Sequence, residues 1–126
     1  MDKPWYKKWP KVYPKTLKYY EGNVADMLAG TAKRYPNRVV CDFMGKKITY
    51  GELEDLVNRF ATALTNLGVK KGDRVALLFP NCPQFLISYY AILRIGAIAT
   101  MCSPLHSERE LLHHLNDSGA ETIVTL

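Results

Sequence analysis

The fold of this chain is decided by one short run, Arg74-Val75-Ala76-Leu77-Leu78-Phe79. The run is apolar almost throughout, which is typical of a parallel strand that is covered on both faces. Pro80-Asn81-Cys82-Pro83 follows directly and places Pro83 in the first turn of a helix, where no backbone N–H is needed. We therefore expect a buried strand that leads straight into a helix.

Downstream of this run the same pattern repeats. The predicted helix continues to Gly96, a strand spans residues 97–103, and Ser107-x-x-Glu110 is a capping box that begins a second helix. A last strand spans residues 121–126. The order β-α-β-α-β predicts right-handed crossovers and a parallel sheet with helices packed on it. The last strand lacks the helix and strands that normally cover such an element, so we expect an incomplete piece of a larger α/β enzyme.

Upstream of the run, two further helices are predicted. Asn23 and Asp26 cap the first, which Pro36 ends, and Thr49-x-x-Glu52 is a capping box for the second. Apolar residues recur in both at helical spacing. They are Val24, Met27, Leu28, Ala32 and Tyr35 in the first helix and Leu53, Leu56, Val57, Phe60, Ala61, Leu64 and Leu67 in the second.

A short hairpin is expected between these two helices. Alternation places Val39, Cys41 and Phe43 on one face of its first strand. Gly45-Lys46 is the predicted turn, and residues 47–50 form the returning strand.

The net charge of +5 belongs to the N-terminal segment. Residues 1–20 hold six lysines against Asp2 alone, whereas residues 21–126 hold 11 basic and 11 acidic side chains. We therefore divide the chain into a basic, aromatic arm at residues 1–22 and an incomplete N-terminal α/β subdomain at residues 23–126. Three prolines predict that the arm is extended. We expect it to lie along its own protein; a homodimer contact, and a stand-alone α/β module that binds RNA or an anionic membrane through the arm, are the alternatives.

The sequence also favours a compartment. No apolar run is long enough to cross a membrane, and the first 20 residues lack the apolar segment of a secretory signal. Cys41, Cys82 and Cys102 are odd in number and widely spaced, as expected of reduced thiols in a cytosolic protein. We expect a cytoplasmic protein, with peripheral membrane contact as the alternative.

Four features are candidates for chemistry. No glycine-rich phosphate motif occurs, because the loop after the first parallel strand is Pro-Asn-Cys-Pro. Glu110-x-x-His113 has the spacing of a metal half-site but lacks partner helices. His114 is expected to point away from that half-site. His106 follows a strand at the carboxyl edge of the sheet, where ligands bind, but no partner residue is predicted for it. Cys82 lies at a helix N-terminus without a histidine or acid beside it. We therefore predict no catalytic, cofactor-binding or metal-binding residue in this chain.

The order of these elements resembles the start of the adenylate-forming superfamily, and specifically of fatty acyl-CoA synthetases. Four stretches carry the resemblance, in the family's order, across essentially the whole chain. They are Lys3-Pro4-Trp5 with Tyr13-Pro14; Ile48-Thr49-Tyr50-Gly51-Glu52-Leu53; Gly68-Val69-Lys70-Lys71-Gly72-Asp73-Arg74-Val75-Ala76; and Ala91-Ile92-Leu93-Arg94-Ile95-Gly96-Ala97 with Ser103-Pro104-Leu105, Glu110-Leu111 and Asn116-Asp117-Ser118-Gly119-Ala120.

The resemblance implies a two-step ligase. ATP and a fatty acid would give an acyl-adenylate and pyrophosphate, with Mg²⁺ offsetting the phosphate charge, and coenzyme A would then displace AMP to give the thioester. In the family, the phosphate loop, the ribose-binding aspartate and the catalytic lysine all lie downstream of this segment. The resemblance therefore implies that these residues support the active site and are inactive on their own.

Overall fold

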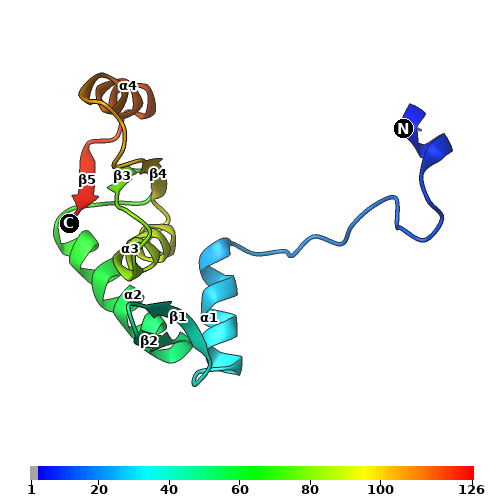
Figure 1. Cartoon of the computed structure of the whole chain (residues 1–126), viewed down its shortest axis with the longest axis horizontal. Helices are drawn as coiled ribbons and strands as arrows, with labels where there is room; N and C mark the ends of the chain where they lie inside the picture. The colour runs from blue at the N-terminus through cyan, green and yellow to red at the C-terminus, as the bar shows by residue number, and fades with distance from the viewer. Residues whose placement is uncertain (1–2) are drawn as a thin grey trace.

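The computed structural model describes residues 3–126 (Figure 1). Its centre is a parallel sheet with the strand order β4-β3-β5, which confirms the predicted α/β fold. β3 comes first in the sequence, yet it lies between the other two strands. The elements are η1 (Pro4–Lys8), α1 (Val24–Arg34), β1 (Val39–Phe43), β2 (Lys46–Thr49), α2 (Tyr50–Asn66), β3 (Arg74–Leu78), α3 (Pro83–Arg94), β4 (Ile98–Cys102), α4 (Glu108–Ser118) and β5 (Thr122–Thr125).

The central strand is covered on both faces, as its apolar sequence predicts. Val75, Ala76 and Leu77 are each 0% exposed. α3 carries the chain from β3 to β4, and α4 carries it back across β3 to β5. Right-handed crossovers that run in opposite directions place their helices on opposite faces, and Figure 1 shows α3 and α4 on either side of the sheet.

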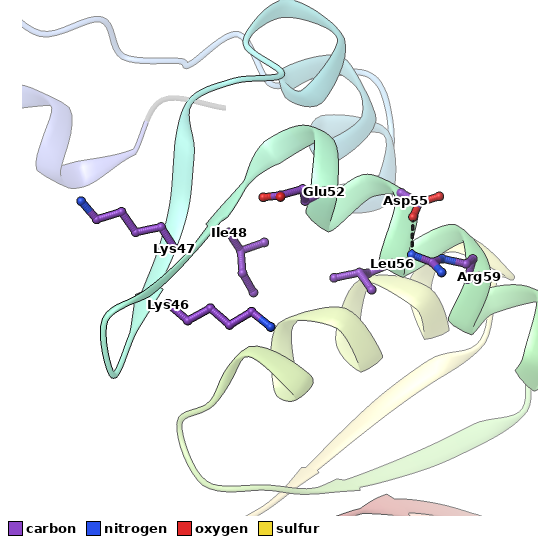
Figure 2. Close-up of a pocket in the computed structure, with 7 residues that line it drawn as sticks. All are labelled: Lys46, Lys47, Ile48, Glu52, Asp55, Leu56 and Arg59. Carbon is purple, nitrogen blue, oxygen red and sulfur yellow. Dashed lines mark hydrogen bonds and ion pairs between the residues drawn. The ribbon is translucent and has the colours of Figure 1, made fainter.

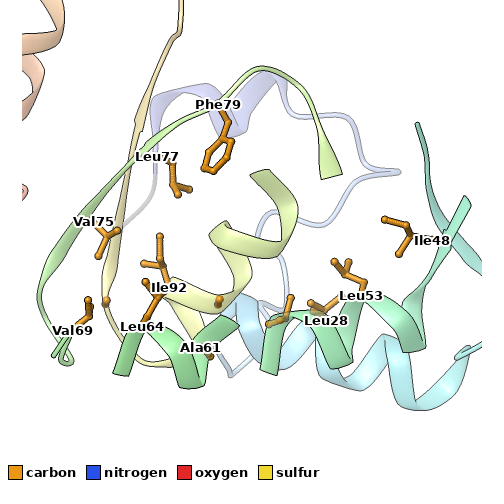
Figure 3. Close-up of a cluster of buried hydrophobic side chains, with 13 residues drawn as sticks. Leu28, Ile48, Leu53, Ala61, Leu64, Val69, Val75, Leu77, Phe79 and Ile92 are labelled. Atoms are coloured by element: carbon orange, nitrogen blue, oxygen red, sulfur yellow. The ribbon is translucent and has the colours of Figure 1, made fainter. Parts of the chain in front are cut away.

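The hydrophobic core lies on the α3 face of the sheet. Leu28, Leu53, Leu64, Leu77 and Ile92 converge there from α1, α2, β3 and α3 (Figure 3). By contrast, α4 has no buried residue and makes its contacts chiefly with β4. Most of the burial that stabilises the fold is therefore on one side of the sheet.

Both predicted capping boxes form, and the predicted cap at Asn23 and Asp26 is a third. The side chains of Asn23, Thr49 and Ser107 accept a backbone N–H from three residues on, at 2.8, 3.3 and 3.4 Å. The carboxylate at the third helical position accepts from the N-cap backbone in return, at 3.4, 2.8 and 2.8 Å. Each box satisfies amides that the first helical turn leaves without partners.

The hairpin turn differs from the prediction by one residue. It is Met44-Gly45, with positive φ values of 52° and 82°, and not Gly45-Lys46. A two-residue turn needs left-handed backbone at both central positions to match the twist of its strands. Met44 therefore adopts a conformation that glycine or asparagine would adopt more easily.

The first strand of the hairpin also departs from simple alternation. A bulge between Val39 and Cys41 shifts the register, so Val40 and Cys41 both pack against the core. Val39 is 49% exposed as a result. The prediction that Val39 shares one face with Cys41 and Phe43 is wrong, because a bulge puts two residues opposite one.

Two helices expose residues that the sequence predicted to be apolar core. Leu67 is 81% exposed because it is the C-cap of α2, where the helix ends. In α1, Val24, Met27 and Tyr35 are exposed, and Ala25 takes a buried position instead. A small residue at that position lets α1 approach its neighbours closely.

An ion pair that the sequence did not predict joins α2 to α3. Arg94 Nη1 donates to Glu54 Oε1 at 2.6 Å and Nη2 donates to Oε2 at 2.9 Å, while Asn58 Oδ1 accepts a further bond from Nη1. The Arg94 and Glu54 side chains are only 20% and 23% exposed. Two-pronged geometry with limited access to water makes this pair stronger than a typical surface pair.

The arm was predicted to be extended, but it begins with a turn of 3₁₀ helix, η1. Pro4 suits the first turn because it has no N–H to satisfy. Beyond η1, Trp9 Nε1 donates to the Tyr13 carbonyl at 3.1 Å, and the Tyr6 hydroxyl donates to the Lys15 carbonyl at 3.2 Å. The arm thus makes local contacts of its own.

The arm does not lie on the folded body. Figure 1 shows it leading away from α1 and ending far from the sheet. No residue of η1 is buried, and every hydrogen bond of residues 3–20 described by the structure stays within the arm. The expectation that the arm lies along its own protein is therefore not met by residues 23–126. Within residues 3–126, no helix has both the length and the apolar content needed to cross a bilayer.

Candidate functional site

A cleft of about 680 Å³ opens at the carboxyl edge of the parallel sheet. The loop after β3 and the loop after β4 meet there because parallel strands end at the same edge, which is where open α/β sheets bind ligands. α3 contributes Phe85 and α4 contributes His114. The lining residues are Phe79, Pro80, Asn81, Phe85, Met101, Cys102, Ser103, Pro104, Leu105, His106 and His114.

The walls of this cleft are mainly apolar. Phe79 and Pro80 after β3, and Phe85 of α3, line the cleft together with the loop that follows β4. That loop is held by a short turn in which the His106 N–H donates to the Ser103 carbonyl at 3.1 Å. An apolar cleft with a few convergent polar groups is the usual form of a small-molecule site.

Two histidines form the main polar feature of the cleft. The rings of His106 and His114 lie 4.6 Å apart between centroids and are tilted by 38°. His106 Nδ1 is buried without a hydrogen-bond partner among the described residues. The prediction that His106 has no partner residue is therefore wrong, because His114 lies beside it.

The pattern of the helix start does not by itself identify this pair. The residue before an N-cap packs towards the fourth residue of its helix. His106 precedes the N-cap Ser107, and His114 lies one turn beyond that fourth position. The contact between the two histidines therefore depends on how the loop after β4 lies over α4.

Glu110 lies beside the histidine pair but is engaged elsewhere. Its Oε2 accepts from the backbone N–H and the hydroxyl of Ser107, both at 2.8 Å. These bonds, and then the nearby His106 and His114, hold the pKa of Glu110 below its usual value. His113, the other half of the Glu110-x-x-His113 spacing, is exposed on α4. In the part of the chain that the structure describes, no three potential metal ligands gather.

The cysteines serve as packing residues. Cys82 is the N-cap of α3 but makes no side-chain capping bond, and it packs against the core. Cys41 lies in β1 and Cys102 in β4, as predicted, and Cys102 is 5% exposed. Burial raises the pKa of the Cys102 thiol, which keeps it protonated although it lines the cleft.

A smaller hollow of about 260 Å³ lies between the hairpin and α2 (Figure 2). Three of its charged side chains are already engaged. Arg59 pairs with Asp55 at 2.6 Å, and Glu52 is held by Thr49 in the capping box. The carboxyl-edge cleft, where imidazole nitrogen is still unpaired, is the better candidate for a functional site.

The comparisons with known proteins agree with this fold. A family model described as AMP-binding enzyme matches residues 28–126. The long-chain-fatty-acid–CoA ligase of Bacillus subtilis is 37% identical over 125 residues, which cover 99% of this chain and 22% of that protein. This chain therefore spans about a fifth of the length of that relative.

Solved structures give the same result. The N-terminal subdomain of Klebsiella oxytoca NpsA has a TM-score of 0.79 and 31% identity, covering 81% of this chain and 27% of that one. The inhibitor-bound N-terminal domain of FACL13 from Mycobacterium tuberculosis has a TM-score of 0.77 and 34% identity, covering 80% and 26%. The resemblance inferred from the sequence is confirmed, and the chain belongs to the family of AMP-binding enzymes.

Proposed function

We propose that this chain supplies the N-terminal part of an ATP-dependent fatty-acid–CoA ligase. The reaction joins a fatty acid to the α-phosphorus of ATP with release of pyrophosphate, and the thiol of coenzyme A then displaces AMP to give the acyl thioester. The observation that carries the proposal is the 37% identity to the B. subtilis long-chain-fatty-acid–CoA ligase over 99% of this chain, the arm included. On this proposal, residues 1–22 are the arm and residues 23–126 are part of a larger AMP-binding domain.

The described residues do not fit the phosphates of ATP. The loop after β3 is Pro-Asn-Cys-Pro, and its two prolines lack the backbone N–H groups with which phosphate loops bind. ATP, Mg²⁺ and coenzyme A are therefore assigned to the rest of the ligase. What this segment contributes is the carboxyl-edge cleft, whose apolar walls suit an acyl chain better than a nucleotide.

A chimera tests the proposal. This chain would replace the matching N-terminal fifth of the B. subtilis ligase, and thioester formation would be measured with long-chain fatty acids. We expect the chimera to form acyl-CoA and the 126-residue chain alone to show no fatty-acid-dependent exchange of pyrophosphate into ATP. Exchange by the chain alone would overturn the assignment of the chemistry. A chimera with a native circular dichroism spectrum and no ligase activity would overturn the proposal that this chain is part of a fatty-acid–CoA ligase.

The proposed ligase works in the cytoplasm, with the arm as its contact with other surfaces. Two alternatives involve the arm. One is a homodimer contact through the arm, and the other is a stand-alone module that binds its ligand through the arm. The position of the arm, away from the body, favours a contact outside this chain.

A further inference from the structure

The arm exposes an unusual set of apolar side chains. Trp5 is 57% exposed, Val12 85%, Leu17 63% and Tyr19 80%. Within the described residues 3–126, no side chain of the arm belongs to the hydrophobic core or packs against it. Transfer of these side chains from water into an apolar phase would be favourable.

Lysine ammonium groups lie directly beside these rings. Lys3 Nζ is 5.3 Å from the centre of the Trp5 ring, and Lys15 Nζ is 5.0 Å from the centre of the Tyr6 ring. Six lysines occur in residues 1–20, while residues 21–126 are neutral overall. Each of these cations thus lies beside an aromatic ring. This combination suits a bilayer surface, where lipid phosphates lie just outside the zone that tryptophan and tyrosine prefer.

The composition of the arm disfavours two other occupants. A nucleic-acid segment would gain most from arginine, which binds phosphate with two bonds and stacks on bases, but the arm has only lysine. Aliphatic Val12 and Leu17 cannot stack on bases either, although they can enter a lipid interface. A second copy of the arm would bring two strongly positive segments together.

From this juxtaposition we infer that the arm, residues 3–20, binds the surface of an anionic lipid bilayer. Trp5 and Trp9 enter the interface, and the lysines contact the lipid phosphates. The inference rests on the arm alone, so it stands or falls independently of the proposed ligase.

The chain provides its own reporter, because Trp5 and Trp9 are its only tryptophans. The 126-residue protein would be titrated with vesicles of phosphatidylcholine and with vesicles of equal parts phosphatidylcholine and phosphatidylglycerol. We expect a blue shift of tryptophan emission, and quenching by brominated acyl chains, only with the anionic vesicles. In 1 M salt, where the Debye length is about 3 Å, we expect the binding to be largely lost.

Matched double variants locate the binding. Lys7→Gln/Lys8→Gln and Lys46→Gln/Lys47→Gln each remove two adjacent exposed lysines, from the arm and from the hairpin. At about fivefold per lysine, the arm variant lowers the partition coefficient about 25-fold, whereas the hairpin variant leaves it nearly unchanged. Equal losses in both variants would overturn the inference.

Two further results would also overturn it. Single-stranded RNA that shifts the emission where anionic vesicles do not would assign the arm to nucleic acid. Emission that is already blue-shifted without vesicles, and that reddens on dilution of the protein, would assign the arm to a second copy of the chain.

Discussion

Glu52 is exposed, yet its carboxylate is fixed at the start of the longest helix. Its Oε2 accepts from the Thr49 N–H at 2.8 Å and from the Thr49 hydroxyl at 3.0 Å. The backbone bond first, and then the hydroxyl bond, hold the pKa of Glu52 below its ordinary value of 4.5, with a smaller contribution from Lys46. The ionised form is therefore favoured in the folded state.

This lowered pKa predicts an acid-dependent loss of stability. A carboxyl group whose pKa is lower in the folded state makes its full contribution to folding stability above the unfolded-state pKa. That contribution is lost as the pH falls through the folded-state pKa. Glu52→Gln keeps a hydrogen-bonding group at this position but cannot titrate. We expect the urea midpoint of the variant to fall less than that of the wild type between pH 6 and pH 3.

Glu121→Gln is the control for this experiment, because it removes the same charge outside any capping box. If both variants follow the wild-type pH curve, the carboxylate of Glu52 does not act through its cap.

At the scale of elements, the contact between α2 and α3 depends on one charged pair within an apolar interface. Arg94→Met keeps most of the side-chain volume but leaves the partly buried Glu54 without its partner. We expect the free energy of unfolding to fall by about 1–3 kcal/mol, the cost of leaving a charged group unsatisfied. Urea unfolding followed by circular dichroism measures it.

Arg59→Met is the matched control, because Arg59 pairs with Asp55 on the exposed face of the same helix, with side chains 71% and 63% exposed. Exposed pairs of this kind contribute about 0.2–1 kcal/mol. Similar losses in the two variants would mean that the Arg94 pair is no stronger than a surface pair.

The elements themselves could be predicted because their signals are local. The capping boxes at Asn23, Thr49 and Ser107 and the apolar run at β3 each specify structure within a few residues. The bulge after Val39 and the exposure of Leu67 could not be predicted in this way. Both depend on how distant segments pair or end, which periodicity along one segment does not record.

The candidate site was harder to predict than the fold for the same reason. Its position at the carboxyl edge of the sheet follows from the strand order. The contact between His106 and His114 depends on how the loop after β4 folds back over α4. The Glu110-x-x-His113 spacing and the Ser107-x-x-Glu110 capping box were both visible in the sequence, and in the structure the cap engages Glu110.

At the scale of the whole molecule, the arm and the body are energetically separate. Deleting residues 1–20 removes no buried residue of η1 and no described hydrogen bond to the body. We expect the free energy of unfolding to change by less than about 0.5 kcal/mol, as for surface changes away from special contacts. Because the deletion removes both tryptophans, far-ultraviolet circular dichroism in urea is the suitable measurement. A loss above about 1 kcal/mol would show that the arm packs on the body in solution.

The position of β3 also has a consequence for how the molecule assembles during synthesis. The strand that ends up in the middle emerges from the ribosome before both of its neighbours, and chains fold as they are made. β4 then adds along one flank of β3 and β5 along the other. The sheet therefore widens outwards in both directions, and no strand has to be inserted between two that are already paired.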